Sequence, residues 1–460
     1  MNHKTKLILL LLFLVQISFA TEKQKQQPNI LLFIADDCTF RDLGCYGGIN
    51  AKTPTIDAFA KEGMQFSRCF QATAMCSPTR TCLYTGLYPV KSGGYPNSTF
   101  VKEGTQSIVQ YMAPKGYKSA LLGKTHISPP EAFPFEYLGD AMVDDLDFEL
   151  MDKFLSGVKE NEDPFCLFVC SHQPHLPYTK GDPSNYDPAK VTLPPYFVDT
   201  EETRASFIKY LAEIDYMDDE FKTSLELLDK YGFSENTIVI FTSEQGNSFP
   251  FAKWTCYGNG LQSAFLVRWP EVIKPGSNSD AMIEYVDVVP TYLDIAGIEI
   301  PDYLEGKSFL PLLKGEKNEH KKYVYGVHTT RGIVNGSEYY GIRTISSADF
   351  RYVLNLTPEA TFQNNLTVDP VKGVVFNSWQ EKGETDEFAE SLSYRYQHRP
   401  AEELYDLKND PYEMNNIASN PKYAAIKKDL SDKLHQWMDQ QGDKGQQTEM
   451  EALEHVLYHR

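Results

Sequence analysis

Short apolar runs alternate with amphipathic stretches through the first two thirds of the chain. The runs share continuous apolar character and turn-forming flanks, which predicts buried strands at residues 29–35, 118–122, 165–170, 237–242 and 264–267. Apolar residues recur at helical spacing over residues 202–231, and a strand followed by a helix is expected within residues 282–298. This order predicts an α/β fold with a largely parallel sheet.

The pattern changes after about residue 314. A polar segment is followed by shorter β-like runs at residues 323–328, 338–344 and 350–356, and then by a helical pattern at residues 421–437. These elements predict a smaller antiparallel sheet with a packed helix. We therefore expect a larger domain at residues 28–315, a C-terminal domain at residues 320–440 and a peripheral tail at residues 441–460.

The first twenty residues have the pattern of a secretory signal peptide. Lys4 and Lys6 precede an apolar stretch at residues 7–19, and Ser18 and Ala20 are small residues at the expected cleavage positions. The stretch is short for a bilayer span, so we expect no stable membrane insertion. A periplasmic or secreted protein is predicted, in preference to a lysosomal one.

Charge and cysteine usage narrow the classes of function. The chain carries a formal net charge of −19, which makes it a poor candidate for binding nucleic acid. Eight cysteines occur without paired C-x-x-C spacing, so a zinc site is not expected. Cys38 and Cys45, or Cys69 and Cys82, could close small disulfide loops. The four N-x-S/T sequons, at Asn97, Asn335, Asn355 and Asn365, matter only in a eukaryotic secretory route.

Two pairs of oxygen-bearing side chains come directly after predicted strands. Asp36 and Asp37 follow the first strand, and Glu244 and Gln245 follow the fourth. Ligands collect beyond the carboxyl ends of the strands in open α/β sheets. Adjacent carboxylates repel each other unless a cation joins them, and carboxylate and amide oxygens suit a hard cation. We favour calcium, because it tolerates more varied ligand geometry than magnesium does.

Basic and imidazole side chains follow the same strands. Lys124 and His126 come after the second strand, His172 and His175 after the third, and Lys253 shortly after the fourth. A lone lysine or histidine is more often a solvated or structural residue. Here most of these residues follow a predicted strand, as the two oxygen-bearing pairs do.

A short motif at residues 76–80 carries the most specific chemistry. Cys76, Pro78 and Arg80 have the form C-x-P-x-R, and Pro78 suits the first turn of a helix. The N-terminus of that helix would offer free N–H groups to an anion, and Arg80 would add a fixed cationic group. An isolated motif of this kind is also compatible with a structural cysteine on an ordinary helix.

This motif and the strand-end residues, in their order along the chain, resemble the type I sulfatases of the alkaline-phosphatase-like superfamily. The run at residues 123–129 is similar to the branch that contains heparan N-sulfatase (sulfamidase). The resemblance implies an alkaline-phosphatase-like α/β/α sandwich and conversion of Cys76 to formylglycine (3-oxoalanine) by a maturation enzyme. One hydroxyl of the hydrated aldehyde would attack sulfur, and the other would help to expel sulfate.

The resemblance also implies a role for each strand-end residue. A calcium ion would be held by Asp36, Asp37, Glu244, Gln245 and the converted residue 76, where the family has Asp-Asn in place of Glu244-Gln245. His126 would act as a base, and His175 or Lys253 would protonate the leaving oxygen. The implied catalytic residues are Cys76, Arg80, Lys124, His126, His175 and Lys253, and His172 would join Lys124, His175 and Lys253 in binding substrate.

The implied substrate is a sulfate ester or sulfamate of a sulfated carbohydrate. In the C-terminal domain, His328, Arg331 and Arg343 could reach a sugar carboxylate or a second sulfate. Two alternatives remain open from the sequence. One is a phosphonate or phosphodiester hydrolase of the same superfamily, and the other is an inactive exported glycan-binding protein, which the Glu244-Gln245 departure would favour.

Overall fold

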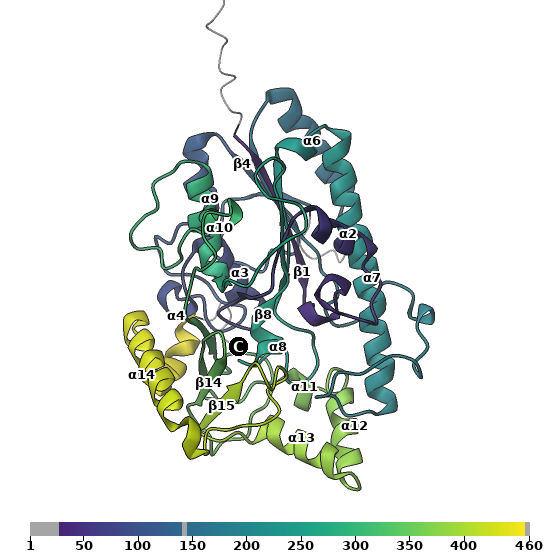
Figure 1. Ribbon diagram of the computed structural model, residues 1–460, viewed down its shortest axis with the longest axis vertical. Coiled ribbons are helices and arrows are strands. Elements are labelled where there is room, and N and C mark those ends of the chain that lie inside the picture. The colour runs from purple at the N-terminus through teal and green to yellow at the C-terminus, as the bar shows by residue number, and fades with distance from the viewer. Residues whose placement is uncertain (1–26, 140–144, 456–460) are drawn as a thin grey trace, which may run out of the picture.

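The computed structural model describes residues 27–139 and 145–455, and its centre is an eight-stranded sheet (Figure 1). Most neighbouring strands run parallel, and β9 is antiparallel to both of its neighbours. The strands across the sheet, in order, are β10 (Ser277–Ser279), β2 (Met64–Phe66), β9 (Phe265–Arg268), β7 (Thr237–Glu244), β1 (Asn29–Asp36), β6 (Phe165–Cys170), β4 (Lys118–Gly123) and β5 (Glu136–Leu138).

Helices cover both faces of this sheet, and alternate residues of β1 show why. Leu31 and Phe33 pack on one face with α2, α6 and α7, whereas Leu32 and Ile34 pack on the other with α3 and α9. Both faces of β1 are buried, so its sequence is continuously apolar. The helices of this layer are α2 (Pro54–Glu62), α3 (Cys76–Thr85), α4 (Pro89–Ser92), α5 (Ile108–Met112), α6 (Phe148–Asn161), α7 (Glu201–Lys230), α8 (Gly258–Leu261), α9 (Val288–Ile295) and α10 (Leu310–Leu313).

A second, antiparallel layer follows in the C-terminal part. It lies at the lower end of the molecule in Figure 1, flanked by α14 on one side and by α12 and α13 on the other. Its sheet is β12 (Val324–His328), β13 (Ile342–Ser346), β14 (Phe350–Asn355) and β15 (Glu402–Asp406). Its helices are α11 (Asn365–Val368), α12 (Val374–Gly383), α13 (Glu387–Gln397), α14 (Ala424–Gln441) and α15 (Gln446–Met450).

Smaller elements complete the fold. A separate three-stranded sheet consists, in order, of β11 (Ile283–Glu284), β3 (Cys69–Phe70) and β8 (Gln262–Ser263). Single 3-10 turns are found at Phe40–Asp42, Gly44–Tyr46, Ala113–Lys115, Pro183–Asn185, Ser234–Asn236, Tyr285–Asp287, Pro421–Tyr423 and Glu451–His455.

The predicted α/β fold with a smaller antiparallel sheet is confirmed. The long helix expected at residues 202–231 is α7 (Glu201–Lys230), which begins after Thr200, where the threonine hydroxyl accepts the N–H of Thr203. Two helices, α12 and α13, lie in a segment where the sequence pattern predicts no helix. The predicted signal peptide at residues 1–20 lies outside the described residues.

Two predictions differ from the structure. The predicted peripheral tail begins at residue 441, but Asp443 and Glu449 are buried, because their carboxylates neutralise the buried guanidinium of Arg343. The disulfide loops are not formed either: all eight cysteines lie in described segments, and each is a free thiol. Within the described parts of the chain, no helix combines the length and the apolar character needed to cross a bilayer.

Candidate functional site

The carboxyl ends of four neighbouring parallel strands meet at one edge of the large sheet. β1 and β7 pair in register so that Asp36 lies beside Glu244, and β4 and β6 pair so that Gly123 lies beside Cys170. The predicted site residues follow directly on these strand ends. The topology therefore brings together side chains that are far apart in the sequence, as expected for a parallel α/β sheet.

Two glycines allow the chain to turn sharply at this edge. Gly123 has a φ of +85°, and a Cβ there would lie 2.3 Å from the carbonyl oxygen of Cys170. A Cβ on Gly246 would lie 1.8 Å from the carbonyl oxygen of Asn259. Any larger residue would collide with backbone at both places, so these glycines fix the paths of Lys124 and Gln245.

Strained backbone is concentrated at the same edge. Within residues 27–139 and 145–455, ten non-glycine residues have a positive φ, and five of them lie at the site or on its cavity, namely Asp37, Ser98, His126, Gln245 and Trp254. Such conformations are costly for residues with a side chain and persist where the surrounding structure holds them. Their gathering at one place indicates that side-chain placement there is under functional constraint.

The two aspartates are fully buried and each is paired with a lysine. Lys124 Nζ forms an ion pair with Asp36, and Lys253 Nζ lies 2.7 Å from Asp37 Oδ2. His175 Nε2 lies 3.7 Å from the same Asp37 oxygen. Burial alone would raise the pKa of Asp36, but Lys124 and His175 outweigh it and hold that pKa well below its usual value.

Cys76 stands at the start of α3, against these charges. Its Sγ lies 3.9 Å from Asp36 Oδ1 and accepts a hydrogen bond from Gln245 Nε2 at 2.9 Å. Burial would raise the pKa of the thiol, but Lys124 and Lys253 lower it well below its usual value. The cysteine of the C-x-P-x-R motif thus lies among the strand-end residues, as predicted.

The N-terminus of α3 is capped from a distant loop. Met75, at the N-cap position, has no side-chain acceptor, and Asn97 Oδ1 accepts the N–H of Ser77 at 3.0 Å instead. Next to Asn97, Ser98 Oγ lies 3.1 Å from His126 Nε2. The His126 ring is in turn within hydrogen-bonding reach of Cys76, and burial lowers its pKa. One loop thus contacts both the start of α3, where Cys76 lies, and the predicted base His126.

Arg80 and Glu244 form a fully buried pair beneath this cluster. Arg80 Nε lies 2.6 Å from Glu244 Oε2, and Arg80 Nη1 donates to the carbonyl oxygen of Lys124 at 2.7 Å. Glu244 Oε1 lies 3.6 Å from Lys124 Nζ. The geometry therefore gives Arg80 the task of holding Glu244 and the Lys124 backbone in place.

The donor atoms at the strand ends lie close enough to share one cation. Oxygen, sulfur and nitrogen atoms of Asp36, Asp37, Cys76 and His175 all lie within 4.8 Å of one another. Of the remaining predicted ligands, Gln245 contacts Asp37 at 2.8 Å, whereas Glu244 is engaged by Arg80. His175 was predicted to bind substrate and is brought into this donor group as well.

A cavity of about 310 Å³ opens above the cluster. Lysines, histidines and amides line it, and none of its described lining residues is acidic. This positive lining stands in a chain with 63 acidic and 44 basic residues. The lining residues are Cys76, Asn97, Ser98, Lys124, His126, His175, Leu176, Ser248, Lys253, Trp254, Gly332, Ile333, Val334, Asn365, Leu366 and Lys372.

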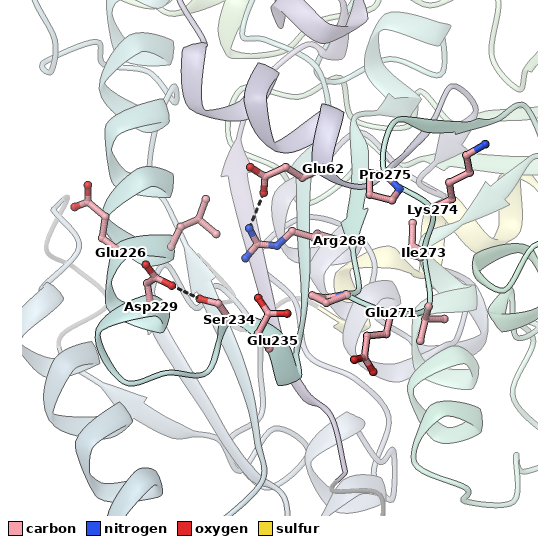
Figure 2. Close-up of a pocket in the computed structure, with 13 residues that line it drawn as sticks. Glu62, Glu226, Asp229, Ser234, Glu235, Arg268, Glu271, Ile273, Lys274 and Pro275 are labelled. Atoms are coloured by element: carbon pink, nitrogen blue, oxygen red, sulfur yellow. Dashed lines mark hydrogen bonds and ion pairs between the residues drawn. The ribbon is translucent and has the colours of Figure 1, made fainter.

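A larger cavity, of about 830 Å³, lies at the opposite edge of the sheet and has a different character (Figure 2). Arg268, which lines it, pairs with Val239 near the amino end of β7. Five acidic residues share the lining with Arg268 and Lys274, and Figure 2 shows Glu62 paired with Arg268. Nothing there combines a buried nucleophile with cations, so the smaller cavity is the candidate site.

Four residues predicted to bind substrate do not line the smaller cavity within the described chain. Arg343 is fully buried, with Nη1 2.8 Å from Glu449 Oε1 and Nη2 3.1 Å from Asp443 Oδ1. His328 is also fully buried, and its pKa is lowered to about 3 by burial and by Arg399 and Arg343. Arg331 lies over the Tyr339 ring, and His172 stands outside the lining. The predictions for Arg343 and His328 are wrong, because both side chains are enclosed within the fold, whereas the predictions for Arg331 and His172 remain untested.

Among the lining residues that sequence reasoning missed as site residues, three carry an amide or an ammonium group. Asn97 and Asn365 were noted only as possible glycosylation sites, and Lys372 not at all. Asn97 comes from the loop before α5, while Asn365 and Lys372 come from the C-terminal part. No local sequence pattern distinguishes them, because only the packing of the two layers brings them to one cavity.

Comparison with known proteins agrees with this geometry. The sequence profile of the family described as Sulfatase matches residues 28–298, and that described as N-sulphoglucosamine sulphohydrolase, C-terminal, matches residues 246–372. An ulvan-active sulfatase of Formosa agariphila is 36% identical over 91% of this chain and 81% of its own length. Human N-sulphoglucosamine sulphohydrolase is 28% identical over 89% of each chain.

A solved structure shares the fold. It is a complex with the substrate D-glucosamine-2-N,6-O-disulfate, and it matches with a TM-score of 0.67 at 21% identity, over 91% of this chain and 99% of that one. The family match covers more than half of the described chain and includes the strand ends that form the site. The chain therefore belongs to the sulfatase family and is a hydrolase of that family.

Proposed function

We propose that this chain hydrolyses sulfate esters or sulfamates of sulfated carbohydrates in the cavity beside Cys76. The observation that carries the proposal is the cavity lining: a buried cysteine at a helix N-terminus, surrounded by Lys124, Lys253 and two histidines, with no acidic residue among the described lining residues. A sulfate group fits this lining by charge. The named activities of the two relatives support a carbohydrate as the carrier of that sulfate.

The donor set fits a hard divalent cation, for which we propose calcium. Asp36 and Asp37 supply two fully buried carboxylates. The Gln245 Oε1 atom is buried and accepts no hydrogen bond from the described residues, so it is free to ligate a cation. We propose Asp36, Asp37, residue 76 and Gln245 as ligands, with Glu244 beside them. When bound, the cation would polarise the sulfate and lower the pKa of a coordinated hydroxyl.

We further propose that a maturation enzyme converts Cys76 to formylglycine, which supplies a hydrated aldehyde as the nucleophile. Lys124, Lys253 and His175 would neutralise the sulfate oxygens, where negative charge develops in the transition state. His126, oriented by Ser98, would hold a proton exchanged with residue 76. His175, or Lys253, would give a proton to the leaving sugar oxygen as the bond from sulfur to that oxygen breaks.

The catalytic groups would lie in the domain at residues 28–315, and the domain at residues 320–440 would complete the cavity. Ile333, Val334 and Leu366 of the C-terminal part line its wall. We propose that the chain is exported to the periplasm or secreted, which suits an enzyme that meets polysaccharides outside the cell.

A substrate screen with two variants tests the proposal. Purified protein from a host with the maturation machinery is assayed on defined sulfated mono- and oligosaccharides and, in parallel, on phosphate and phosphonate esters. We expect sulfate release by the wild type and loss of at least about a thousandfold in Cys76→Ala. Cys82→Ala, in the same helix but in the hydrophobic core, is the matched control and should retain activity.

Two results would count against the proposal. Preferential cleavage of phosphate or phosphonate esters would assign the site to the related hydrolase class. An unmodified thiol throughout the Cys76 peptide in mass spectra, together with binding but no turnover, would indicate a glycan-binding protein.

A further inference from the structure

The rim of the cavity differs from its floor in how its charges are balanced. At the floor, Lys124 and Lys253 each face a buried aspartate. At the rim, Lys372 forms no ion pair with any carboxylate in the described parts of the chain. The sequence predicts a substrate-binding cation in the C-terminal domain. In the structure, Lys372 of that part of the chain lines the cavity, and the predicted residues His328, Arg331 and Arg343 do not.

The acidic group nearest in sequence to Lys372 is held mainly by the main chain. Asp369 Oδ1 accepts the backbone N–H groups of Val371 and Lys372, both at 2.9 Å. These backbone hydrogen bonds lower the pKa of Asp369, and the positive charge of Lys372 lowers it as well. The Lys372 ammonium group thus interacts with Asp369 through space, but the two form no close ion pair in the described chain, which leaves the ammonium group able to contact a bound anion.

Two amides of the cavity lining, Asn97 beside the start of α3 and Asn365 from the C-terminal part, are oriented as donors. Asn97 Oδ1 accepts the N–H of Ser77, and Asn365 Oδ1 accepts a hydrogen bond from Asn335 Nδ2 at 2.9 Å. In the described structure, the Nδ2 groups of Asn97 and Asn365 have no hydrogen-bond partner of their own. The rim thus combines two amide donors and one ammonium group, and no carboxylate accompanies them in the lining.

We propose that the cavity selects a sulfated sugar carrying a second anionic group, which binds at the rim to Lys372 with Asn97 and Asn365. A donor-only rim on a strongly acidic chain is suited to an anion, because a neutral hydroxyl would leave the ammonium group without a counter-charge. Ile333, Val334 and Trp254 supply apolar surface to the same cavity lining, against which the carbon face of a sugar ring can pack. This inference rests on the proposed function and names its substrate class more closely.

The second anionic group could be a carboxylate or a sulfate, and binding to matched probe pairs distinguishes the two. One pair is a monosulfated disaccharide that contains a uronic acid, and its carboxyl-reduced counterpart. The other is D-glucosamine-6-O-sulfate and D-glucosamine-2-N,6-O-disulfate. Affinities are measured by calorimetry in a Cys76→Ala background, which removes turnover, with and without Lys372→Ala. Lys61→Ala, at an exposed position of α2 outside the cavity, is the matched control with the same change in charge.

We expect Lys372→Ala to weaken binding of the doubly anionic member of at least one pair by about fivefold to twentyfold. The singly anionic member should change by less than about twofold, and the difference should shrink as salt is raised. Lys61→Ala should change neither. Equal effects on both members of each pair, no effect, or no binding of any probe would overturn the inference.

The outcome is separable from that of the proposed function. Suppose that Lys372→Ala weakens binding of the doubly anionic probe selectively, but the wild type releases sulfate from no sulfated sugar. This result would contradict the hydrolase proposal and would still support binding of a second anionic group by Lys372. Sulfate release without discrimination would do the reverse.

Discussion

Two regions of this molecule bury opposite charges, and they differ in whether those charges face a cavity. In the cavity cluster, Asp36 and Asp37 pair with Lys124 and Lys253 beneath the open space beside Cys76. In the Arg343 cluster, one guanidinium meets Asp443 and Glu449.

The side chains of the Arg343 cluster have no exposed surface, and Thr329 donates to Glu449 at 2.9 Å. The cavity cluster keeps an unsatisfied amide oxygen at Gln245 and presents its lysines to the space above. Buried ion pairs alone are therefore a poor mark of function. A buried charge that still faces a cavity is a better one, because its partner can be a substrate.

The largest expected effect is on stability in the Arg343 cluster. Arg343→Ala leaves two buried carboxylates without a cation, and we expect it to lower the free energy of unfolding by about 3–5 kcal/mol. Arg331→Ala removes a cation from a more exposed pair, 3.7 Å from Glu338, and should cost less than about 1 kcal/mol. Urea unfolding measures both. Similar small losses in the two variants would erase the distinction between closed and exposed pairs.

The matching change in the cavity cluster should act on catalysis. Lys124→Ala removes a cation that faces the proposed sulfate position, and we expect kcat/KM to fall by about a hundredfold to a thousandfold. Its effect on unfolding should be smaller than that of Arg343→Ala, since water can enter the cavity. Steady-state kinetics with unfolding curves of the same preparation check this. A loss confined to stability would make the two clusters equivalent.

A partly buried acid without a lysine or arginine ion pair sharpens the comparison. Asp42 contacts Tyr210 at 2.8 Å and forms no ion pair in the described structure, and burial raises its pKa to about 6. Below about pH 4 the Asp42 carboxyl is protonated in both the folded and the unfolded state, so its burial as a charged group does not lower the free energy of unfolding. As pH rises through 6, the folded state loses stability relative to the unfolded state.

The side chain of Asp42→Asn cannot ionise. The free energy of unfolding of this variant should therefore rise relative to that of the wild type as the pH is raised from 4 to 7.5. We expect about 2 kcal/mol, less than the full value of the shift because part of Asp42 contacts water. Thermal or urea unfolding across this pH range gives the difference in free energy. A difference that does not change with pH would show that the carboxyl is already ionised in the fold.

The smallest expected effect concerns Ser98, in the loop before α5, which contacts His126 beside the cavity cluster. Ser98→Ala removes the hydrogen bond to His126, and we expect kcat/KM to fall by about threefold to tenfold, the value of one such bond. Ser98→Gly removes the same hydroxyl and suits the positive φ of this position, so it should lose activity to the same extent. The melting temperature should fall in neither variant. Equal activity in Ser98→Ala and the wild type would remove Ser98 from the positioning of His126.

The strand-end residues show how much of the site could be predicted. Asp36 and Glu244 end apolar runs that the sequence marks as buried strands, and parallel strands place their carboxyl ends at one edge. The C-x-P-x-R motif identified Cys76 and its helix without any tertiary information. His328 and Arg343 were misassigned because a polar residue on a half-buried strand gives the same local pattern whether it faces a cavity or a buried partner.

Sequence alone determined the α/β order of elements, the place of Cys76 at the start of a helix and the set of charges at the strand ends, because each depends on local periodicity, on a local motif or on residues that a strand delivers to a known edge. Tertiary structure decided which charges are satisfied within the protein and which remain for a ligand. Arg343 is neutralised by residues about a hundred positions away, while Lys372, Asn97 and Asn365 reach the cavity from separate segments. Burial and pairing of this kind depend on long-range packing, which no local pattern records.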